Sequence, residues 1–212
     1  MVEHFSHIRD SDQTRQNILD VALKEFAKFG LAGARVDRIA KEMNTTKGMI
    51  YYYFKDKEGL YKAVLERIYP CLRAEEQDLS LSELDPIAAL ERIIDFTIDY
   101  HEQHSDFVRI VMIENINNAE YLRQTGIDST ISYVILLTLG DIIRRGCESG
   151  IFKRDITPVD LHILYTSFSF YRISNASTVS SVLGLNTLNA VNSKRHRQMI
   201  KDSVRAYMTS AA

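Results

Sequence analysis

The sequence has little of several features on which particular protein classes depend. Its two cysteines, Cys71 and Cys147, are too few for a disulfide framework and lack the spacing of metal ligands, so we expect reduced, buried thiols. The longest mainly apolar run, 133–139, is far too short to cross a bilayer. Residues 1–10 contain His, Arg and acids instead of an apolar stretch, so we expect no signal peptide, no membrane partner and a cytoplasmic protein.

The chain also lacks a large excess of one charge. With 26 Lys and Arg against 28 Asp and Glu, the net charge is -2, so any nucleic-acid binding must be local. Residues 35–57 hold six basic and three acidic side chains, whereas residues 61–212 hold 16 basic and 19 acidic ones. This distribution fits a DNA-binding patch on a mildly acidic body, although an ordinary solvated charge run would explain it equally well on charge alone.

Strand-like alternation of apolar and polar residues is missing, and apolar residues recur near every 3.6 positions throughout. A chain of 212 residues, 45% of them hydrophobic, can bury a real core and allows one or two domains. We therefore expect an all-α fold of about nine helices. The expected helices cover 12–29, 36–43, 47–53, 57–72 with a kink or break at Pro70, 85–104, 105–116, 127–148, 157–174 and 193–208. Residues 1–11 are expected to form a flexible arm whose His4, His7 and Arg9 could touch a DNA backbone, and residues 178–192 an irregular segment.

Two short expected helices lie on either side of a small polar turn. Residues 36–43 and 47–53 each carry apolar residues at helical spacing, and Asn44-Thr45-Thr46 between them favours a turn and a helix N-cap. Two short helices joined by a tight turn outline a helix-turn-helix. The outward face of the second helix carries hydroxyl and ammonium groups, which suit phosphate oxygens and base edges. Double-stranded DNA is therefore the expected partner.

The helix-turn-helix needs support from other parts of the chain. The helix-turn-helix and the first helix share a predicted core that is too small to be stable alone. The helix beginning at residue 57 should therefore connect this core to the rest of the chain. We expect a DNA-binding domain over 1–56, including the arm 1–11, and a ligand-binding and dimerisation domain over 57–212. The core is predicted from Ile18, Ala22, Phe26, Ile39, Ala40, Ile50 and Phe54.

Roughly the first 65 residues resemble the TetR family of bacterial transcription regulators. The resemblance is carried by residues 18–26, Gly30, Arg35-Val36, Ile39-Ala40 and the run Thr46-Lys47-Gly48-Met49-Ile50-Tyr51-Tyr52-Tyr53-Phe54-Lys55-Asp56-Lys57-Glu58-Gly59-Leu60. Two positions depart from the family pattern. Tyr53 stands where the family often has His, and Val36 stands where a capping Thr or Ser is common, which leaves the start of the second helix less well capped.

The resemblance implies a homodimer whose two recognition helices enter successive major grooves of a partly palindromic operator. It also implies a ligand cavity in the C-terminal bundle, release of DNA when the cavity fills, and dimerisation through 157–174 and 193–208. We therefore expect a ligand-responsive repressor, not an enzyme, with no cofactor or metal and with an anionic or aromatic small-molecule effector. The DNA-binding residues implied are Arg35, Thr45, Thr46, Lys47, Gly48, Tyr51, Tyr52, Tyr53 and Lys57.

Candidate effector-binding residues lie on core-facing stripes of the C-terminal half, and packing in the core is the favoured reading for each aromatic among them. Arg172 among aromatic residues needs an anionic partner if buried. That partner could be a ligand carboxylate or Glu114, and a position of Arg172 on the dimer surface is equally compatible. The candidates are Tyr100, Phe107, Tyr133, Phe168, Tyr171 and Arg172.

A possible metal site, a basic cluster and an alternative function also follow from the sequence. His101 and His104 with Glu102 resemble a metal pair, but no third ligand has a suitable spacing. The basic cluster 194–197 favours a solvated turn, or pairing with acids such as Asp141 or Glu148, over a second nucleic-acid patch. A helical enzyme or a partner-binding protein with a vestigial DNA module is the alternative function, although no nucleophile–base pair, phosphate loop or carboxylate pair supports an enzyme.

Overall fold

The computed structural model describes the backbone of residues 2–127 and 129–211 and the side chains of residues 11–127 and 133–211. Regular structure within these residues consists of ten α-helices and two short 3-10 helices, η1 (Leu81–Glu83) and η2 (Leu122–Gln124). The expected all-α fold is confirmed. Within the same residues, no helix is both long and apolar enough to cross a membrane. The chain forms two compact units, Met1–Tyr69 with Arg109–Ile127 and Pro70–Val108 with Asp128–Ala212, which we describe separately.

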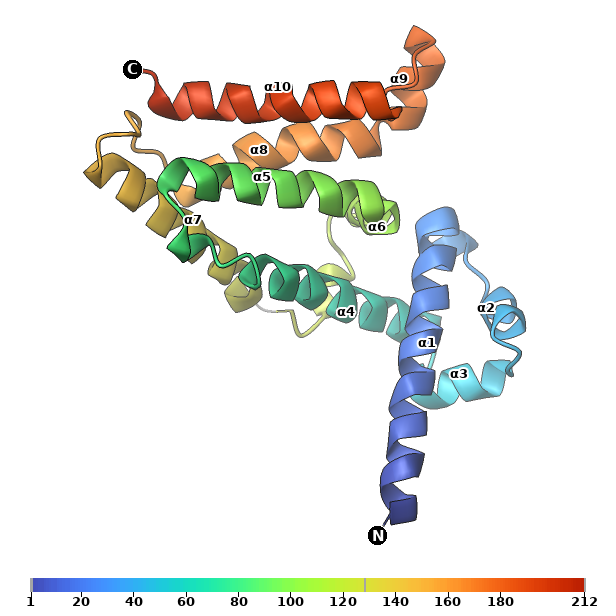
Figure 1. The fold of residues 1–212 in the computed structure, drawn as a ribbon. Helices are drawn as coiled ribbons and strands as arrows, with labels where there is room; N and C mark the ends of the chain where they lie inside the picture. The colour runs from blue at the N-terminus through green and yellow to red at the C-terminus, as the bar shows by residue number, and fades with distance from the viewer. Residues whose placement is uncertain (1, 128, 212) are drawn as a thin grey trace. The chain divides into compact units, whose positions relative to one another are not determined.

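The first unit contains α1 (Val2–Gly33), α2 (Val36–Glu42), α3 (Lys47–Phe54) and the beginning of α4 (Lys57–Gln77) (Figure 1). Gly30 has φ 65° and ψ 174°, so the regular helix ends where the sequence predicts it to end. At its other end α1 begins at Val2, which replaces the expected flexible arm by helical backbone. Residues 2–11 contain no Gly or Pro that would stop the helix. The suggested DNA contacts of His4, His7 and Arg9 fall on side chains outside the described ones.

The core of the first unit is the one that the sequence predicts, with an addition from α4. All seven predicted core residues are buried. Tyr61 of α4 is also fully buried, and its ring meets that of Phe26 edge to face with 5.0 Å between centroids. α4 therefore supplies part of the core that supports α2 and α3, as expected for a module too small to stand alone.

The second unit packs α5 (Pro86–Gln103), α7 (Ser129–Glu148), α8 (Pro158–Ser174) and α10 (Ala190–Thr209) around a shared apolar core. Figure 1 shows α5, α8 and α10 lying alongside one another. The predicted starts of α5 and α8 are confirmed. Asp85 accepts hydrogen bonds from the first turn of α5, Thr157 accepts one from the first turn of α8, and each is followed by Pro at the first helical position.

Several expectations about the helices and thiols were wrong in detail. α4 continues through Pro70 to Gln77, so the helix does not break there, and the alternative of a kink at Pro70 stays a prediction. A tenth helix, α9 (Ala176–Leu183), forms in the segment expected to be irregular, because its residues up to Gly184 include no helix breaker. Cys71 is exposed and Cys147 half-buried, so neither is the buried thiol expected.

The remaining helix, α6 (Ser105–Ile116), begins in the second unit and ends in the first. The units also change within α4, between Tyr69 and Pro70. The functional boundary between 56 and 57 stays a prediction, since it concerns which residues bind DNA and not which residues pack together.

Candidate nucleic-acid interface and ligand pocket

The turn between α2 and α3 is built by its small polar residues. Asn44 takes φ 51°, and the backbone N–H of Thr45 donates to the carbonyl of Ala40 at 2.9 Å. The side-chain oxygen of Thr46 then accepts from the N–H of Met49 at 3.2 Å and caps α3. α2 has no such cap, since Arg35 at its N-cap makes no side-chain bond there. The turn therefore fixes the direction of α3 and leaves its first residues, 46–49, exposed.

Gly48 lies in this exposed first turn. A Cβ added there would meet only the side-chain oxygen of Thr46, at 3.8 Å, so nothing within the described structure requires glycine. Glycine also weakens a helix by about 1 kcal/mol relative to alanine. Gly59 is different, because a Cβ there would lie 2.2 Å from the carbonyl oxygen of Phe54. Gly59 serves the fold, whereas Gly48 leaves room for a group outside the chain.

The predicted cations at this surface are exposed and share one acid. Lys47 lies 3.0 Å from Asp37, and Arg35 lies 3.9 Å from the same carboxylate. The side chains of all three are about half exposed or more. The hydrogen bond to Asp37 raises the pKa of Lys47. Both cations are therefore accessible, and Asp37, which the sequence patterns did not single out, neutralises part of the surface.

The three predicted tyrosines differ in exposure. Tyr52 is 79% exposed, whereas Tyr51 and Tyr53 are half-buried. The hydroxyl of Tyr53 lies 3.3 Å from that of Ser11 on α1, and its ring packs edge to face on that of Tyr52. Core packing thus accounts for part of two rings, while the hydroxyl contacts with phosphate stay a prediction.

Lys57 is held differently from Lys47. Its ammonium lies 3.4 Å from the carbonyl oxygens of Ala32 and Ala34, at the end of α1. An ammonium has three donors, so one remains for another acceptor. Lys57 thus joins the start of α4 to the end of α1. The structure also exposes Met49, 44% accessible beside Gly48, which the sequence analysis did not select because it reads as one more apolar helical residue.

The six candidate effector residues are divided among three places. Tyr100 and Phe107 are buried and pack edge to face at 5.5 Å. Tyr133 on α7 is 59% exposed and lines none of the pockets described below. The remaining three lie together on α8.

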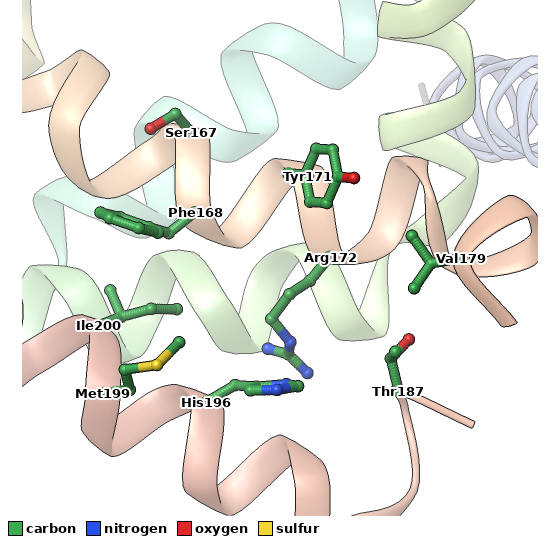
Figure 2. A pocket seen from close by; sticks show the side chains of 9 residues that line it. All are labelled: Ser167, Phe168, Tyr171, Arg172, Val179, Thr187, His196, Met199 and Ile200. Carbon is green, nitrogen blue, oxygen red and sulfur yellow. The ribbon is translucent and has the colours of Figure 1, made fainter. Parts of the chain in front are cut away.

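Phe168, Tyr171 and Arg172 line one cavity of about 480 Å³, formed by α8, α9, the segment after it and α10 (Figure 2). The other side of this cavity could not be predicted from the sequence, because its residues lie on segments that only the packing of α9 and α10 brings to α8. A signal was present in the basic cluster 194–197, which contains His196. The further lining residues are Ser167, Val179, Thr187, His196, Met199 and Ile200.

Arg172 has partners within the unit. Its Nη2 donates to Glu102 at 2.7 Å and to Ser193 at 2.9 Å. The suggestion that Glu114 is the partner of Arg172 is wrong, because Glu114 instead accepts a hydrogen bond from the hydroxyl of Tyr61 in the first unit. The side chain of Arg172 is 9% exposed and that of Glu102 is 29% exposed, so the arginine end of this ion pair is nearly buried and the carboxylate end is partly accessible.

The basic cluster 194–197 pairs with acids, but not with the suggested ones. Arg197 bonds to Asp95 and Asp99 on α5. Asp141 and Glu148 instead form ion pairs with Arg144 on their own helix, α7. Residues four apart on a helix meet directly, so the acids of α7 are satisfied locally.

His101 of α5 and His104, which caps its C-terminus, make different contacts. Nδ1 of His101 lies 2.8 Å from Oγ of Ser169, and burial lowers the pKa of His101 to about 4. His104 packs against the ring of Tyr100. Among the described residues, no group of three or more His, Cys, Asp or Glu could hold a metal ion.

Comparisons with known proteins agree with this arrangement. Residues 18–64 match the family model described as bacterial regulatory proteins, tetR family, and residues 86–204 match the tetracyclin repressor-like C-terminal domain. The chain is 34% identical to the HTH-type transcriptional repressor NicS of Pseudomonas putida over 177 residues, 84% of each chain. It is 38% identical over 109 residues to the HTH-type transcriptional repressor SCO4008 of Streptomyces coelicolor, covering 51% of this chain and 53% of that protein.

A solved structure shares the fold over nearly the whole length. The putative transcriptional regulator SCO4942 of Streptomyces coelicolor superposes with a TM-score of 0.66 and 25% identity, over 92% of this chain and 98% of that one. The capped and exposed first turn of α3, a helical C-terminal unit with a cavity, and matches to both family models lead to one conclusion. The protein belongs to the TetR family of bacterial transcription regulators.

Proposed function

We propose that the protein is a transcriptional repressor that binds a partly palindromic DNA operator as a homodimer and releases it when a small molecule binds its C-terminal domain. The single observation that carries the proposal is the exposed first turn of α3, where Gly48 stands although the chain itself leaves room for a Cβ. Close approach of a backbone to phosphates or base edges is the use that such a glycine has. The names of its relatives NicS and SCO4008 support a repressor. The proposed action is binding of DNA and of a small molecule, without a catalytic step.

Dimerisation through α8 and α10 is supported by the apolar side chains that these helices leave in contact with solvent. Exposed large apolar residues mark interaction surfaces when they gather on one face. Two patches on one homodimer would add their phosphate contacts, which a chain with a net charge of -2 needs. The exposed large apolar residues on the two helices are Val159, Ile163, Phe168, Tyr171, Val191, Met199 and Tyr207.

Release of DNA would pass through α4. This helix begins at Lys57 in the first unit and continues to Gln77 in the second. Its Tyr61 lies in the core of the DNA-binding unit, so a tilt of α4 would move that unit. An effector shifts such an equilibrium by the difference in its affinity for the two positions. A regulator that reads DNA works in the cytoplasm of a bacterium.

Selection of bound duplexes from a random-sequence library tests the proposal, followed by footprinting of the selected site. We expect one site with two related half-sites about one helical turn apart, and a complex of two chains per site by sedimentation. Selection of no sequence above background would contradict the proposed function. A partner-binding protein with a vestigial DNA module would give that result.

A further inference from the structure

Six buried side-chain nitrogen or oxygen atoms have no hydrogen-bond partner within the described structure; two of them, on Arg73 and Arg154, lie elsewhere, and four belong to residues lining the cavity of about 480 Å³. These four are Nε and Nη1 of Arg172, Oγ1 of Thr187 and Nδ1 of His196. Buried polar groups are nearly always satisfied, since each one left without a partner costs about 1–3 kcal/mol. Three such residues around one cavity therefore indicate that a polar group belongs between them.

Arg172 defines which kind of group this is. A guanidinium has five N–H donors, and the two on Nη2 are used by Glu102 and Ser193. The one on Nε and the two on Nη1 are left, on a side chain that is only 9% exposed. These groups can only donate, so the complementary group must be an acceptor. A carboxylate gives the stronger, charge-assisted bonds.

The walls of the cavity define the rest of the molecule. Figure 2 shows Phe168, Met199 and Ile200 gathered at one end, and Arg172 with His196 toward the other. Small-molecule sites commonly have volumes of about 300–1,000 Å³ and combine apolar walls with a few convergent polar groups. A ring-sized apolar body would contact the first end while an acidic group reached the second.

We infer that the cavity between α8, α9 and α10 binds a small monocarboxylate with an apolar, ring-sized body, and that Arg172, Thr187 and His196 bind its carboxylate. The regulatory consequence, release of the operator, rests on the proposed function, whereas the binding itself does not. The exposed parts of Phe168 and Met199 also belong to the proposed dimer face, so a second chain would cover the cavity. The ligand site and the proposed dimer face therefore adjoin.

Calorimetric titration of the full-length protein with benzoate, phenylacetate, 1-naphthoate and hexanoate tests the inference. The neutral benzamide and phenylacetamide are the matched comparisons, and inorganic phosphate separates carboxylate recognition from binding of any anion. We expect at least one ring carboxylate to bind at least about tenfold more tightly than its amide and than phosphate. Equal binding of acid and amide, preference for phosphate, or no binding of any carboxylate would overturn the inference.

Two variants locate the binding site. Arg172→Gln should weaken binding of the carboxylate at least about tenfold, and Thr187→Val should weaken it severalfold, while binding of the amide changes less. Arg144→Gln is the control, because it removes an equal charge from α7 in the same unit, where Arg144 pairs with Asp141 and Glu148 and does not line the cavity. Thermal unfolding of each variant identifies loss of fold, and Thr187→Val keeps the test open if Arg172→Gln does not fold. Wild-type affinity in a folded Arg172→Gln, or in Thr187→Val, would place the carboxylate elsewhere and contradict the inference.

The same samples are assayed for binding to the selected operator and for oligomeric state. A protein that binds the operator but no carboxylate would contradict this inference and leave the proposed function intact. A protein that binds the carboxylate through Arg172 but selects no DNA would do the reverse. If the monomer binds the carboxylate and the dimer does not, a side chain of the partner occupies the cavity. That result would also overturn the inference.

Discussion

The hydroxyl of Tyr61 donates a hydrogen bond of 2.9 Å to Oε1 of Glu114, and both side chains are buried. Burial, and after it the bond to Glu114, raises the pKa of Tyr61 above its ordinary value, so the phenol stays a donor. The other carboxylate oxygen accepts from the backbone N–H of Leu122 at 2.9 Å. Because the Tyr61 ring also packs on Phe26, Glu114 connects the core beneath α2 and α3 with the segment that follows α6.

Tyr61→Phe would leave one oxygen of the buried Glu114 carboxylate without its donor. We expect the free energy of unfolding in urea to fall by about 1–3 kcal/mol. Tyr121→Phe is the matched control, since this ring packs on Tyr61 at 5.5 Å, and we expect a change within about 0.5 kcal/mol. A Tyr61→Phe variant as stable as the wild type would show that the hydroxyl bond adds nothing to the unit.

Lys47→Ala and Lys57→Ala should weaken operator binding and each reduce the slope of log affinity against log salt by about 1. Lys57→Ala should also lower the melting temperature, because its ammonium bonds to the carbonyls of Ala32 and Ala34. Lys153→Ala, an exposed lysine of the second unit, is the control and should change neither quantity. Fluorescence anisotropy at several salt concentrations gives the slopes. Unchanged slopes in both variants would remove these lysines from the interface.

Gly48→Ala should separate stability from DNA binding. The new Cβ has room and removes a glycine from a helix, so the free energy of unfolding should rise by about 0.5–1 kcal/mol. Operator affinity should fall about tenfold or more if the backbone approaches DNA at this turn. Gly59→Ala should instead destabilise the fold, since its Cβ would collide with the carbonyl of Phe54. A stabilised Gly48→Ala with full operator affinity would be inconsistent with close approach at residue 48.

Stability should decrease on mild acidification because of two histidines, His101, which is buried, and His162, which is half-buried. Burial lowers the pKa values of His101 and His162 to about 4 from the ordinary 6.5, so between these values the unfolded chain binds protons that the folded chain does not. The contribution is complete above pH 6.5 and is lost as the pH falls toward 4, with a slope of about 1.4 kcal/mol per pH unit for each histidine.

Urea unfolding between pH 7.5 and 5 measures this slope. His101→Gln, which can still bond to Ser169, should reduce the slope by roughly the share of one histidine, about 1.4 kcal/mol per pH unit. His104→Gln, at an exposed position, should leave the slope unchanged. Identical slopes in the wild type and His101→Gln would mean that other groups produce the acid sensitivity.

Ile163→Glu tests the dimer face. Ile163 on α8 is 57% exposed in the single chain, so a charge there costs little in the monomer and much in a buried contact. We expect the dimer dissociation constant, from sedimentation equilibrium, to rise at least about tenfold, because an unpaired buried charge costs several kcal/mol. Ile116→Glu, at a 76% exposed residue of the first unit, is the control and should leave the constant unchanged.

Local patterns predicted most of the helices and all seven residues of the first core. Helix periodicity, the caps at Thr46, Asp85 and Thr157, and the stop at Gly30 depend on neighbours in the chain, so they can be found by inspection. The prediction failed at α9, where Ser and Asn suggested an irregular segment although nothing in 176–183 breaks a helix.

Pairing of charges could not be predicted in the same way. Glu114, Asp141 and Glu148 were all suggested as partners of C-terminal basic residues, and each has another partner. Ion pairs between helices depend on the rotation of each helix about its axis, which a single sequence does not give. The division of the six candidate effector residues among three places has the same cause.

By itself the sequence determined the helical fold, the helix-turn-helix and the exposed groups of α3, because helix periodicity and capping are local. Only the tertiary structure decided what Arg172 contacts. Its Nη2 meets Glu102 and Ser193 from two other helices, while its remaining donors meet a cavity that Thr187 and His196 complete. These residues come from separate segments, and burial in one place is what makes their unmatched polar atoms costly and therefore informative.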